Sequence, residues 1–433
     1  MNGFPSSEAR RPMKILALSN LYPPDFVGGY ELGCAHVVDA LRDRGHDVRV
    51  LTAAPRLPVA SPPHVLRRFK LTDEWNPNGM SKHPLGYRLD EAESRLVNAY
   101  NVHALTTVLD EFQPDAVYVC AVTGLGGFGL MACLQFLDIP WVWQLGDCVP
   151  RILCSTERRT FPMLAEEFTR RIRGTYIVVS ERLRQETEEC GLTLGDRVET
   201  IPYWITGPQE AERVDFYRGG HLRIMAAGQV AQFKGSDILI EAAARLRDAG
   251  HDDFSVHMYG NLYDHWLLEL IRKRNLTDHV ILKGVLPQKL LLETYKNYDL
   301  FAFPTLEREP FGLVPLEAVA RGCVPIISRQ CGIAEWLVHG LHCLKADRTP
   351  EAFARAFADV IEQRIDPEPI ARRGAAAAWR DFHIDAIIPR IEQLLADAAS
   401  REKGIAGSSH DAYRLARMAE QLTASLLQES IIA

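Results

Sequence analysis

The 433-residue sequence predicts an α/β protein of two consecutive domains, each with a buried sheet covered by helices. Short, continuously apolar runs alternate with amphipathic segments, as in Lys14–Ser19 followed by Leu32–Arg44. The alternation starts again at Leu222–Ala227, after a polar stretch at Tyr203–Gly220 that is typical of a linker. The predicted divisions are an N-terminal domain (13–203), a C-terminal domain (221–385), and C-terminal helices with a tail (386–433).

Composition excludes several classes of protein. With 47% hydrophobic and 24% charged residues, the chain resembles an ordinary globular protein with ample core. The net charge of -7 gives no reason to expect nucleic acid as a partner, since domains that bind nucleic acid are usually basic. The nine cysteines include no CxxC pair, so we expect reduced thiols and neither a disulfide framework nor a zinc site.

Two segments bear on localisation. The first 13 residues contain no apolar region of the kind found in a signal peptide. The uncharged stretch Ala116–Leu137 is long enough to cross a membrane, but glycines divide it into a strand (Ala116–Ala121), a loop and a helix (Leu130–Leu137). We therefore expect a cytoplasmic protein, with peripheral attachment to the inner face of the membrane left open.

The first domain opens with a strand, a helix and a second strand at Val48–Thr52. The loop after the first strand contains Gly28 and Gly29. A glycine pair lets the backbone approach a ligand closely, and a tight turn needed only for packing is an equally good interpretation. Residues Ala54–Arg88 contain many prolines and show no clear period, so we expect an irregular segment there.

A second glycine cluster suggests a different activity. Residues Gly124–Gly129 match G-x-G-x-x-G between a strand and a helix, and Asp147 follows at about the distance expected for a ribose contact. Alone, this pattern indicates an NAD-dependent oxidoreductase. It does not follow the first strand of its domain and no hydride-transfer site accompanies it, so we keep this activity only as a lesser alternative.

In the second domain, Leu222–Ala227 leads through a loop into a helix at Ser236–Ala249. Lys234 lies where that loop meets the helix. At such a position its compact ammonium group can bind a diphosphate. The alternative interpretation is a lysine that is only solvated at the surface. We expect the alternation to continue with strands at Phe254–Gly260, Val280–Gly284 and Val324–Ser328 and helices at Leu267–Arg274, Lys289–Tyr298, Glu351–Gln363 and Pro369–Leu395.

The central stretch of this domain is Glu309–Glu317, EPFGLVPLE, which follows a buried strand and leads into a short helix. Gly312 lets the backbone approach a ligand, and the first amides of the helix suit a phosphate. Carboxylates suit paired sugar hydroxyls because each oxygen accepts a hydrogen bond. Two solvated glutamates near a helix start are an equally good interpretation from spacing alone.

EPFGLVPLEA resembles the E-x7-E signature of glycosyltransferase family 4, and the similarity extends over roughly residues 13–400. The resemblance implies a GT-B fold, in which two Rossmann-like domains face each other and the C-terminal helix crosses back to the N-terminal domain. It implies retaining sugar transfer from a nucleotide-diphosphate sugar. The donor-binding residues that it implies are Gly28, Gly29, Gln229, Lys234, Val285, Glu309, Phe311, Gly312, Leu313, Val314 and Glu317.

The resemblance also implies roles for these residues. Lys234 and the helix amides would stabilise the departing diphosphate, Glu309 would hold donor-sugar hydroxyls, and Glu317 would bind the ribose. Lys234 and Glu309 are therefore the predicted catalytic residues. The sequence departs from the family at two places: Gln229 stands where an arginine is common, and no histidine follows the strand at Trp141–Leu145, where Asp147 is a candidate polar contact.

We therefore expect a retaining, metal-independent enzyme without a cofactor, since the chain has no Asp-x-Asp dyad in a loop and no His/Cys cluster at ligand spacing. Its acceptor would be a hydroxyl of a glycan, a lipid-linked sugar or a small molecule. The missing arginine and histidine leave a rival open, a non-catalytic GT-B subunit that binds a sugar or nucleotide.

Overall fold

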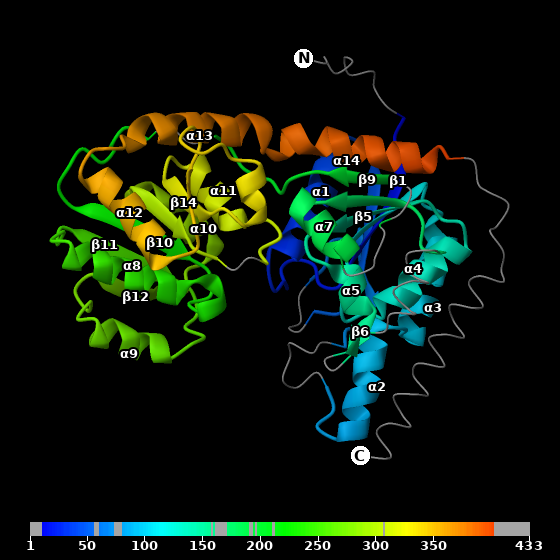
Figure 1. The fold of residues 1–433 in the computed structure, drawn as a ribbon. Helices are drawn as coiled ribbons and strands as arrows, with labels where there is room; N and C mark the ends of the chain where they lie inside the picture. The colour runs from blue at the N-terminus through cyan, green and yellow to red at the C-terminus, as the bar shows by residue number, and fades with distance from the viewer. Residues whose placement is uncertain are drawn as a thin grey trace. The chain divides into compact units, whose positions relative to one another are not determined.

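The computed structural model describes residues 11–55, 60–72, 80–156, 159–160, 171–189, 194, 197–209, 213–305 and 308–401. The chain divides into two compact units. The first comprises Met1–Val178, Leu183–Ile201 and Ile388–Ala433, and the second comprises Val179–Arg182 and Pro202–Ile387. The last described helix, α14 (Ile384–Ala399), therefore starts in the second unit and continues in the first (Figure 1).

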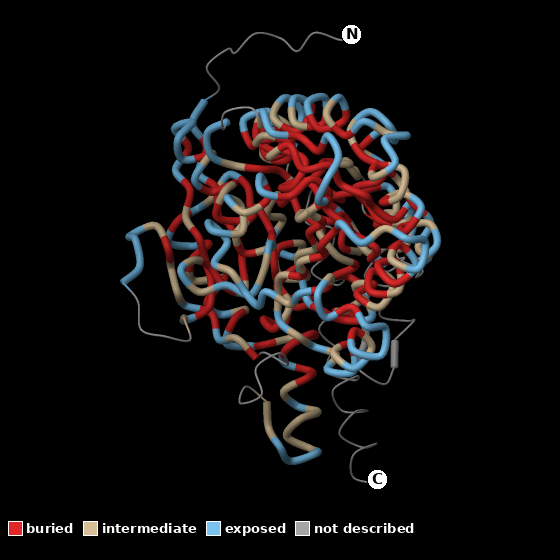
Figure 2. Tube along the Cα trace, turned by 90° about the vertical axis from the view of Figure 1, so that its left-hand side faces the viewer, coloured by how far each residue is buried: buried red, intermediate tan, exposed pale blue. Residues whose placement is uncertain are grey.

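The first unit contains a parallel sheet of seven strands in the order β3-β2-β1-β4-β5-β8-β9. These strands are β1 (Lys14–Ser19), β2 (Asp47–Ala53), β3 (Val65–Phe69), β4 (Ala116–Ala121), β5 (Trp141–Leu145), β8 (Thr175–Val178) and β9 (Arg197–Thr200). A two-stranded antiparallel pair joins β6 (Ser155–Thr156) to β7 (Arg159–Thr160). In the register of the sheet, Ile15 lies opposite Val48 on one side and Ala116 on the other. All three are fully buried, because helices cover both faces of a parallel sheet. Figure 2 draws buried stretches of the chain in red and exposed stretches in pale blue.

The described helices of the first unit are α1 (Gly29–Asp43), α2 (Pro84–Arg95), α3 (Ala99–Phe112), α4 (Gly127–Phe136), α5 (Val149–Leu153) and, from Leu183 onward, α7 (Glu181–Glu189). Two of these helices have a side-chain N-cap. The side chains of His83 and Asn98 accept hydrogen bonds from backbone N–H groups in the first turns of α2 and α3. The C-terminal part of α14 also belongs to this unit. There the Glu392 carboxylate, which is almost fully buried, accepts a hydrogen bond from the Arg44 guanidinium at 2.6 Å. Its other oxygen lies 2.9 Å from Nε2 of His46.

The second unit contains a parallel sheet of six strands in the order β12-β11-β10-β13-β14-β15. Its strands are β10 (Leu222–Ala227), β11 (Phe254–Tyr259), β12 (Val280–Gly284), β13 (Leu300–Phe303), β14 (Val324–Ser328) and β15 (Leu344–Ala346). Its helices are η1 (Gln232–Lys234), α8 (Ser236–Asp248), α9 (Trp266–Lys273), α10 (Gln288–Thr294), η2 (Tyr295–Asn297), α11 (Leu313–Ala320), η3 (Gly332–Glu335), α12 (Pro350–Ile361) and α13 (Pro367–Asp381).

The core of the second unit lies between the sheet and the neighbouring helices α8 and α12 (Figure 1). Ile224 of β10, Leu239 of α8 and Phe353 of α12 are among its almost fully buried members. The strand order reverses direction between β10 and β13. In parallel sheets a ligand crevice forms at that point, outside the carboxyl ends of the strands.

Several predicted elements are wrong in detail. The segment predicted to be irregular contains β3, and the predicted loop ahead of Leu130 is shorter because α4 already begins at Gly127. The single helix predicted at Pro369–Leu395 is two helices. It breaks because the extended backbone there pairs with Ile205, whose N–H donates to the Phe382 carbonyl at 2.9 Å.

The predicted tail beyond residue 401 lies outside the described residues. Within the described ranges, no helix combines the length and apolar character that a membrane span requires.

Candidate active site in the second unit

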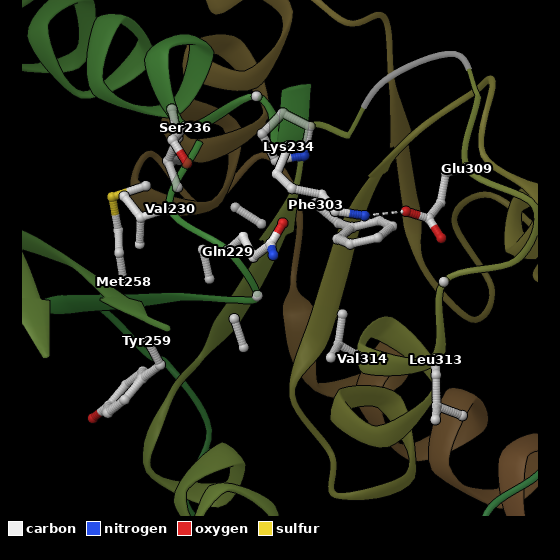
Figure 3. A pocket seen from close by; sticks show the side chains of 18 residues that line it. Gln229, Val230, Lys234, Ser236, Met258, Tyr259, Phe303, Glu309, Leu313 and Val314 are labelled. Atoms are coloured by element: carbon white, nitrogen blue, oxygen red, sulfur yellow. Dashed lines mark hydrogen bonds and ion pairs between the residues drawn. The ribbon is translucent and has the colours of Figure 1, made fainter. Parts of the chain in front are cut away.

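A cavity of about 190 Å³ lies at the carboxyl end of the second sheet (Figure 3). The ends of β10, β11 and β13 form its floor, and the starts of α8 and α11 form its walls. Its lining residues are Ala226, Ala227, Gly228, Gln229, Val230, Lys234, Gly235, Ser236, Leu239, Met258, Tyr259, Ala302, Phe303, Pro304, Glu309, Gly312, Leu313 and Val314. Six of the predicted donor-binding residues therefore share one cavity: Gln229, Lys234, Glu309, Gly312, Leu313 and Val314.

The loop after β10 carries Lys234 into this cavity, and Gly235 makes that possible. Gly235 has a φ of +76°, and a Cβ there would lie 1.9 Å from the Pro304 carbonyl oxygen. Only glycine lets the loop pack so closely on the end of β13. This contact brings Lys234 beside Glu309, which is 75 residues further along the chain.

Lys234 and Glu309 form an ion pair across the cavity. Nζ of Lys234 lies 2.7 Å from Oε2 of Glu309, and their side chains are 35% and 15% exposed. A dashed line marks this contact in Figure 3. The Thr305 hydroxyl donates to the same oxygen at 3.4 Å. The Gly332 N–H donates to the Glu309 carbonyl at 2.9 Å, which fixes the backbone below the carboxylate. Without a ligand, the cation and the carboxylate neutralise each other.

The N-terminus of α11 forms the opposite wall. Gly312 has a φ of +103°, in the left-handed region that favours glycine, and no side chain caps the helix there. Leu313 and Val314 follow as its first residues and line the cavity. A helix start carries partial positive charge on its first N–H groups. The cavity thus combines an ammonium group, a helix N-terminus and a carboxylate.

Glu317 lies in the same helix but does not line the cavity. Its carboxylate is buried and accepts a hydrogen bond from the Tyr295 hydroxyl at 3.1 Å, and Gln288 contributes a further side-chain hydrogen bond. Burial raises the pKa of Glu317, and these hydrogen bonds offset part of the rise. Sequence reasoning missed both partners, since neither stands near Glu317 along the chain.

The other predicted donor residues of the second unit also lie off the cavity. Phe311 is almost fully buried, with its ring centroid 5.5 Å from that of Tyr203. Val285 follows β12 and is 61% exposed. Neither residue is therefore in contact with the cavity.

Gly28, Gly29 and Asp147 lie in the first unit. Gly28 precedes α1 and its N–H donates to Oε2 of Glu31 at 2.9 Å, whereas Gly29 is the first residue of that helix rather than part of a loop. A Cβ at Gly28 would meet no atom within 4 Å, so the backbone there is open to close approach. Oδ1 of Asp147 accepts the Cys148 N–H at 2.6 Å, just before α5.

The NAD-dependent interpretation is wrong. The turn at Gly124–Gly129 is filled by the chain's own loop, because the N–H groups of Gly126 and Gly129 donate to the carbonyls of Ser94 and Leu96 at 2.9 and 2.7 Å. A Cβ at Gly126 would lie 2.2 Å from the Asn98 nitrogen. These glycines admit a neighbouring backbone segment, which takes the place that a pyrophosphate would need.

Tyr259 is a cavity residue that sequence reasoning missed. It ends β11, and its hydroxyl lies 2.9 Å from that of Tyr298, which in turn lies 2.6 Å from Nδ1 of His257. Its position at the carboxyl end of a strand is a signal that could have identified it. Among the described residues, no group of three or more His, Cys, Asp or Glu side chains is arranged to hold a metal ion.

Two family models match this chain. The model described as Glycosyltransferase Family 4 matches residues 27–206, and the model described as Glycosyl transferases group 1 matches residues 211–377. The chain belongs to glycosyltransferase family 4. Similar curated members include an uncharacterized glycosyltransferase of Methanocaldococcus jannaschii, 23% identical over 76% of this chain and 83% of that protein. A glycogen synthase of Mycobacterium tuberculosis is 25% identical over 90% of this chain and 96% of its own length.

Solved structures of other glycosyltransferases have the same architecture as this family 4 member. Sucrose-phosphate synthase from Thermosynechococcus elongatus has a TM-score of 0.66 at 17% identity, covering 89% of this chain and 98% of that one. Anabaena HepE in complex with UDP has a TM-score of 0.63 at 17% identity, covering 89% and 100%. At this level of identity the likeness concerns the fold, and the predicted two-domain α/β GT-B fold is confirmed.

Proposed function

We propose that this family 4 glycosyltransferase transfers a sugar from a nucleotide-diphosphate sugar to a hydroxyl acceptor, with retention of configuration and without a metal ion or cofactor. The observation that carries the proposal is the cavity in which Lys234, Glu309 and the start of α11 meet. Related folds add support, because HepE has been solved with UDP and with UDP-glucose. An anionic donor suits a cavity with these positive groups.

Binding of the donor would exchange the partner of Lys234. In the free protein its ammonium group is paired with Glu309. A diphosphate carries more negative charge than one carboxylate, so it would replace Glu309 as the counter-ion of Lys234. The first N–H groups of α11, at Leu313 and Val314, would bind the phosphate oxygens from the other side. The amide of Gln229 supplies a neutral donor where family members often have an arginine.

The same exchange would free the Glu309 carboxylate to bind the donor sugar. Once released from Lys234, Glu309 could accept hydrogen bonds from two hydroxyls of the donor sugar beside the anomeric carbon. Thr305 would continue to orient it. Glu317 lies outside the cavity, so it would bind the ribose only if the nucleoside part of the donor extends beyond the cavity to its carboxylate, which Tyr295 and Gln288 hold in place.

In the transfer step, the bond between the anomeric carbon and the diphosphate oxygen breaks, and the acceptor oxygen bonds to that carbon on the same face. The acceptor proton passes to the departing diphosphate. Negative charge accumulates on the diphosphate as its bond breaks. Lys234 and the helix amides therefore bind the transition state more strongly than the ground state, which is the condition for acceleration.

Two measurements test the proposal. A thermal-shift screen of UDP-, GDP- and ADP-sugars identifies the donor, and NMR then follows the anomeric configuration of the sugar released by slow donor hydrolysis. We expect the product to keep the donor's configuration at early times. An inverted product refutes the retaining mechanism. Nucleotide binding with neither hydrolysis nor transfer would instead support the non-catalytic subunit.

A further inference from the structure

Three aromatic residues lie beside the proposed donor cavity. Phe233 immediately precedes Lys234 in η1, and its ring centroid lies 5.7 Å from the Lys234 ammonium nitrogen. Tyr263, in the loop that follows β11, packs against Phe233 with ring centroids 5.9 Å apart and ring planes at 84°. Trp266 is the first residue of α9. None of the three lines the donor cavity, so the proposed donor site gives them no role.

Two of these rings are exposed to solvent. Tyr263 is 65% exposed and Trp266 is 46% exposed, whereas Phe233 is partly buried. An edge-to-face contact occupies at most one face of the Tyr263 ring, so at least one face is open to a ligand. Single exposed aromatic side chains are usual at a protein surface, but neighbouring ones are typical of a binding surface.

The two loops that carry Lys234 and Tyr263 are joined by hydrogen bonds. The carbonyl of Val230, a residue that lines the donor cavity, accepts the N–H groups of Tyr263 and Asp264 at 3.0 and 3.3 Å. In the other direction, Oδ2 of Asp264 accepts the Gln232 N–H at 2.6 Å. The backbone below the rings is therefore held in place beside the cavity, and little conformational entropy is lost when a ligand binds there.

The surface combines flat aromatic faces with polar groups at their edges. Asp264 and the exposed His265 stand between Tyr263 and Trp266 in the sequence. Oδ1 of Asp264 takes part in no hydrogen bond with another described residue. A pyranose ring has the complementary pattern, because its faces carry C–H groups and its edge carries hydroxyls. The C–H groups suit the negative face of an aromatic ring, and the hydroxyls can donate to a carboxylate.

A nucleobase could also stack on such rings, but the proposed donor orientation directs it elsewhere. The ribose is assigned to Glu317 in α11, which contacts η2 and α13, whereas Phe233 and Tyr263 precede α8 and α9, which contact each other. Right-handed crossovers place the helices after β10 and β11 on one face of the sheet and the helix after β13 on the other. The nucleoside would therefore leave the cavity on the side away from the rings.

We propose that Phe233, Tyr263 and Trp266 form a subsite that binds a sugar ring of a glycan acceptor. This inference rests on the proposed function, because it takes the acceptor to be a glycan. A β-linked glucopyranose ring suits the surface best, since its substituents are equatorial and C–H groups line both of its faces. Tyr263 supplies the stacking face, Phe233 orients that ring, and Trp266 supplies a second face.

Ligand-observed NMR titration of the full chain with cellopentaose tests this subsite, with sorbitol as a control that has hydroxyls but no ring. We expect cellopentaose to bind and sorbitol not to bind at the same concentration. Tyr263→Ala should weaken the binding of cellopentaose at least threefold, and Tyr263→Ala/Trp266→Ala at least tenfold. Tyr263→Phe should keep the wild-type affinity, because stacking needs the ring and not the hydroxyl. Tyr100→Ala is the matched control, since Tyr100 is a 60% exposed tyrosine of α3 in the first unit.

The same variants are titrated with UDP, GDP or ADP, whichever binds the wild type. We expect Tyr263→Ala to keep the wild-type Kd for the nucleotide. Three outcomes overturn the subsite: no binding of cellopentaose, an unchanged affinity for it in Tyr263→Ala, or an equal loss of nucleotide affinity in that variant, which would assign the rings to the donor. Nucleotide binding without cellopentaose binding refutes the subsite alone, whereas a wild type that binds no nucleotide refutes the proposed function.

Discussion

Truncating Lys234 to alanine tests the proposed donor site most directly, because the structure predicts a small effect on stability and a large one on rate. The Lys234–Glu309 pair is partly solvated, at 35% and 15% exposure. Pairs of this kind contribute about 0–1 kcal/mol to folding, so the variant should remain folded. In the transfer step, losing one group that stabilises developing negative charge typically costs about 100- to 1,000-fold in kcat, or about 2.7–4 kcal/mol.

The measurement is the single-turnover rate of donor cleavage at saturating enzyme, compared with the steady-state rate and with the Kd of the free nucleoside diphosphate. Lys273→Ala is the matched control, since Lys273 is an exposed lysine at the end of α9 and does not line the cavity. We expect Lys234→Ala to lose most of its single-turnover rate while the control keeps its own. A rate within a few-fold of wild type would show that Lys234 is a solvated surface charge without a catalytic role.

Four further predictions follow from the site and from the last helix. Glu317→Ala should weaken nucleotide binding by about 1.5–3 kcal/mol, the value of a hydrogen bond to a charged group, and an unchanged Kd would remove Glu317 from the site. Gln229→Arg should tighten the donor and the free nucleoside diphosphate together and slow product release, which stopped-flow nucleotide release would detect. Activity should survive EDTA; loss that manganese restores would contradict metal independence. Burial raises the pKa of Glu392, but hydrogen bonds from His46 and Arg44 outweigh it and hold that pKa below its ordinary value of about 4.3. The stabilisation is therefore present above that pH and is lost as pH falls through the native pKa. The hydrogen-exchange protection factors of residues 388–399, which are corrected for the slower intrinsic exchange in acid, should therefore fall in acid, and Glu392→Gln should abolish this acid dependence.

Much of the second unit could be predicted from sequence because its signals are local. Lys234 and Gly312 both stand at junctions between a loop and a helix, where apolar strands, glycines and helix periodicity mark the carboxyl end of a sheet. Residues at such junctions converge on one crevice whenever the strands are parallel. The meeting of Lys234 and Glu309 therefore follows from topology, although the sequence contains nothing about their 2.7 Å separation.

The features that could not be predicted depend on contacts between distant parts of the chain. The break before α14 requires Ile205, which is 177 residues from Phe382. The glycines at Gly124–Gly129 match a dinucleotide motif, yet their packing partner is the segment that ends at Asn98. Tyr295 reaches Glu317 because α10 and the turn after it fold back on α11. In each case only the fold identified the partner.

The first unit is discontinuous along the chain, and this constrains how it can form during synthesis. Its sheet is complete once β9 has been made at Thr200, but it also includes the residues from Ile388 onward. Apolar side chains there, such as Ile391 and Leu395, are fully buried. A ribosome that adds roughly 5–20 residues per second needs about ten seconds or more to make the intervening segment. During that interval the nascent first domain exposes the surface that α14 later covers, so chaperone binding to that surface is expected to end only when the last helix emerges.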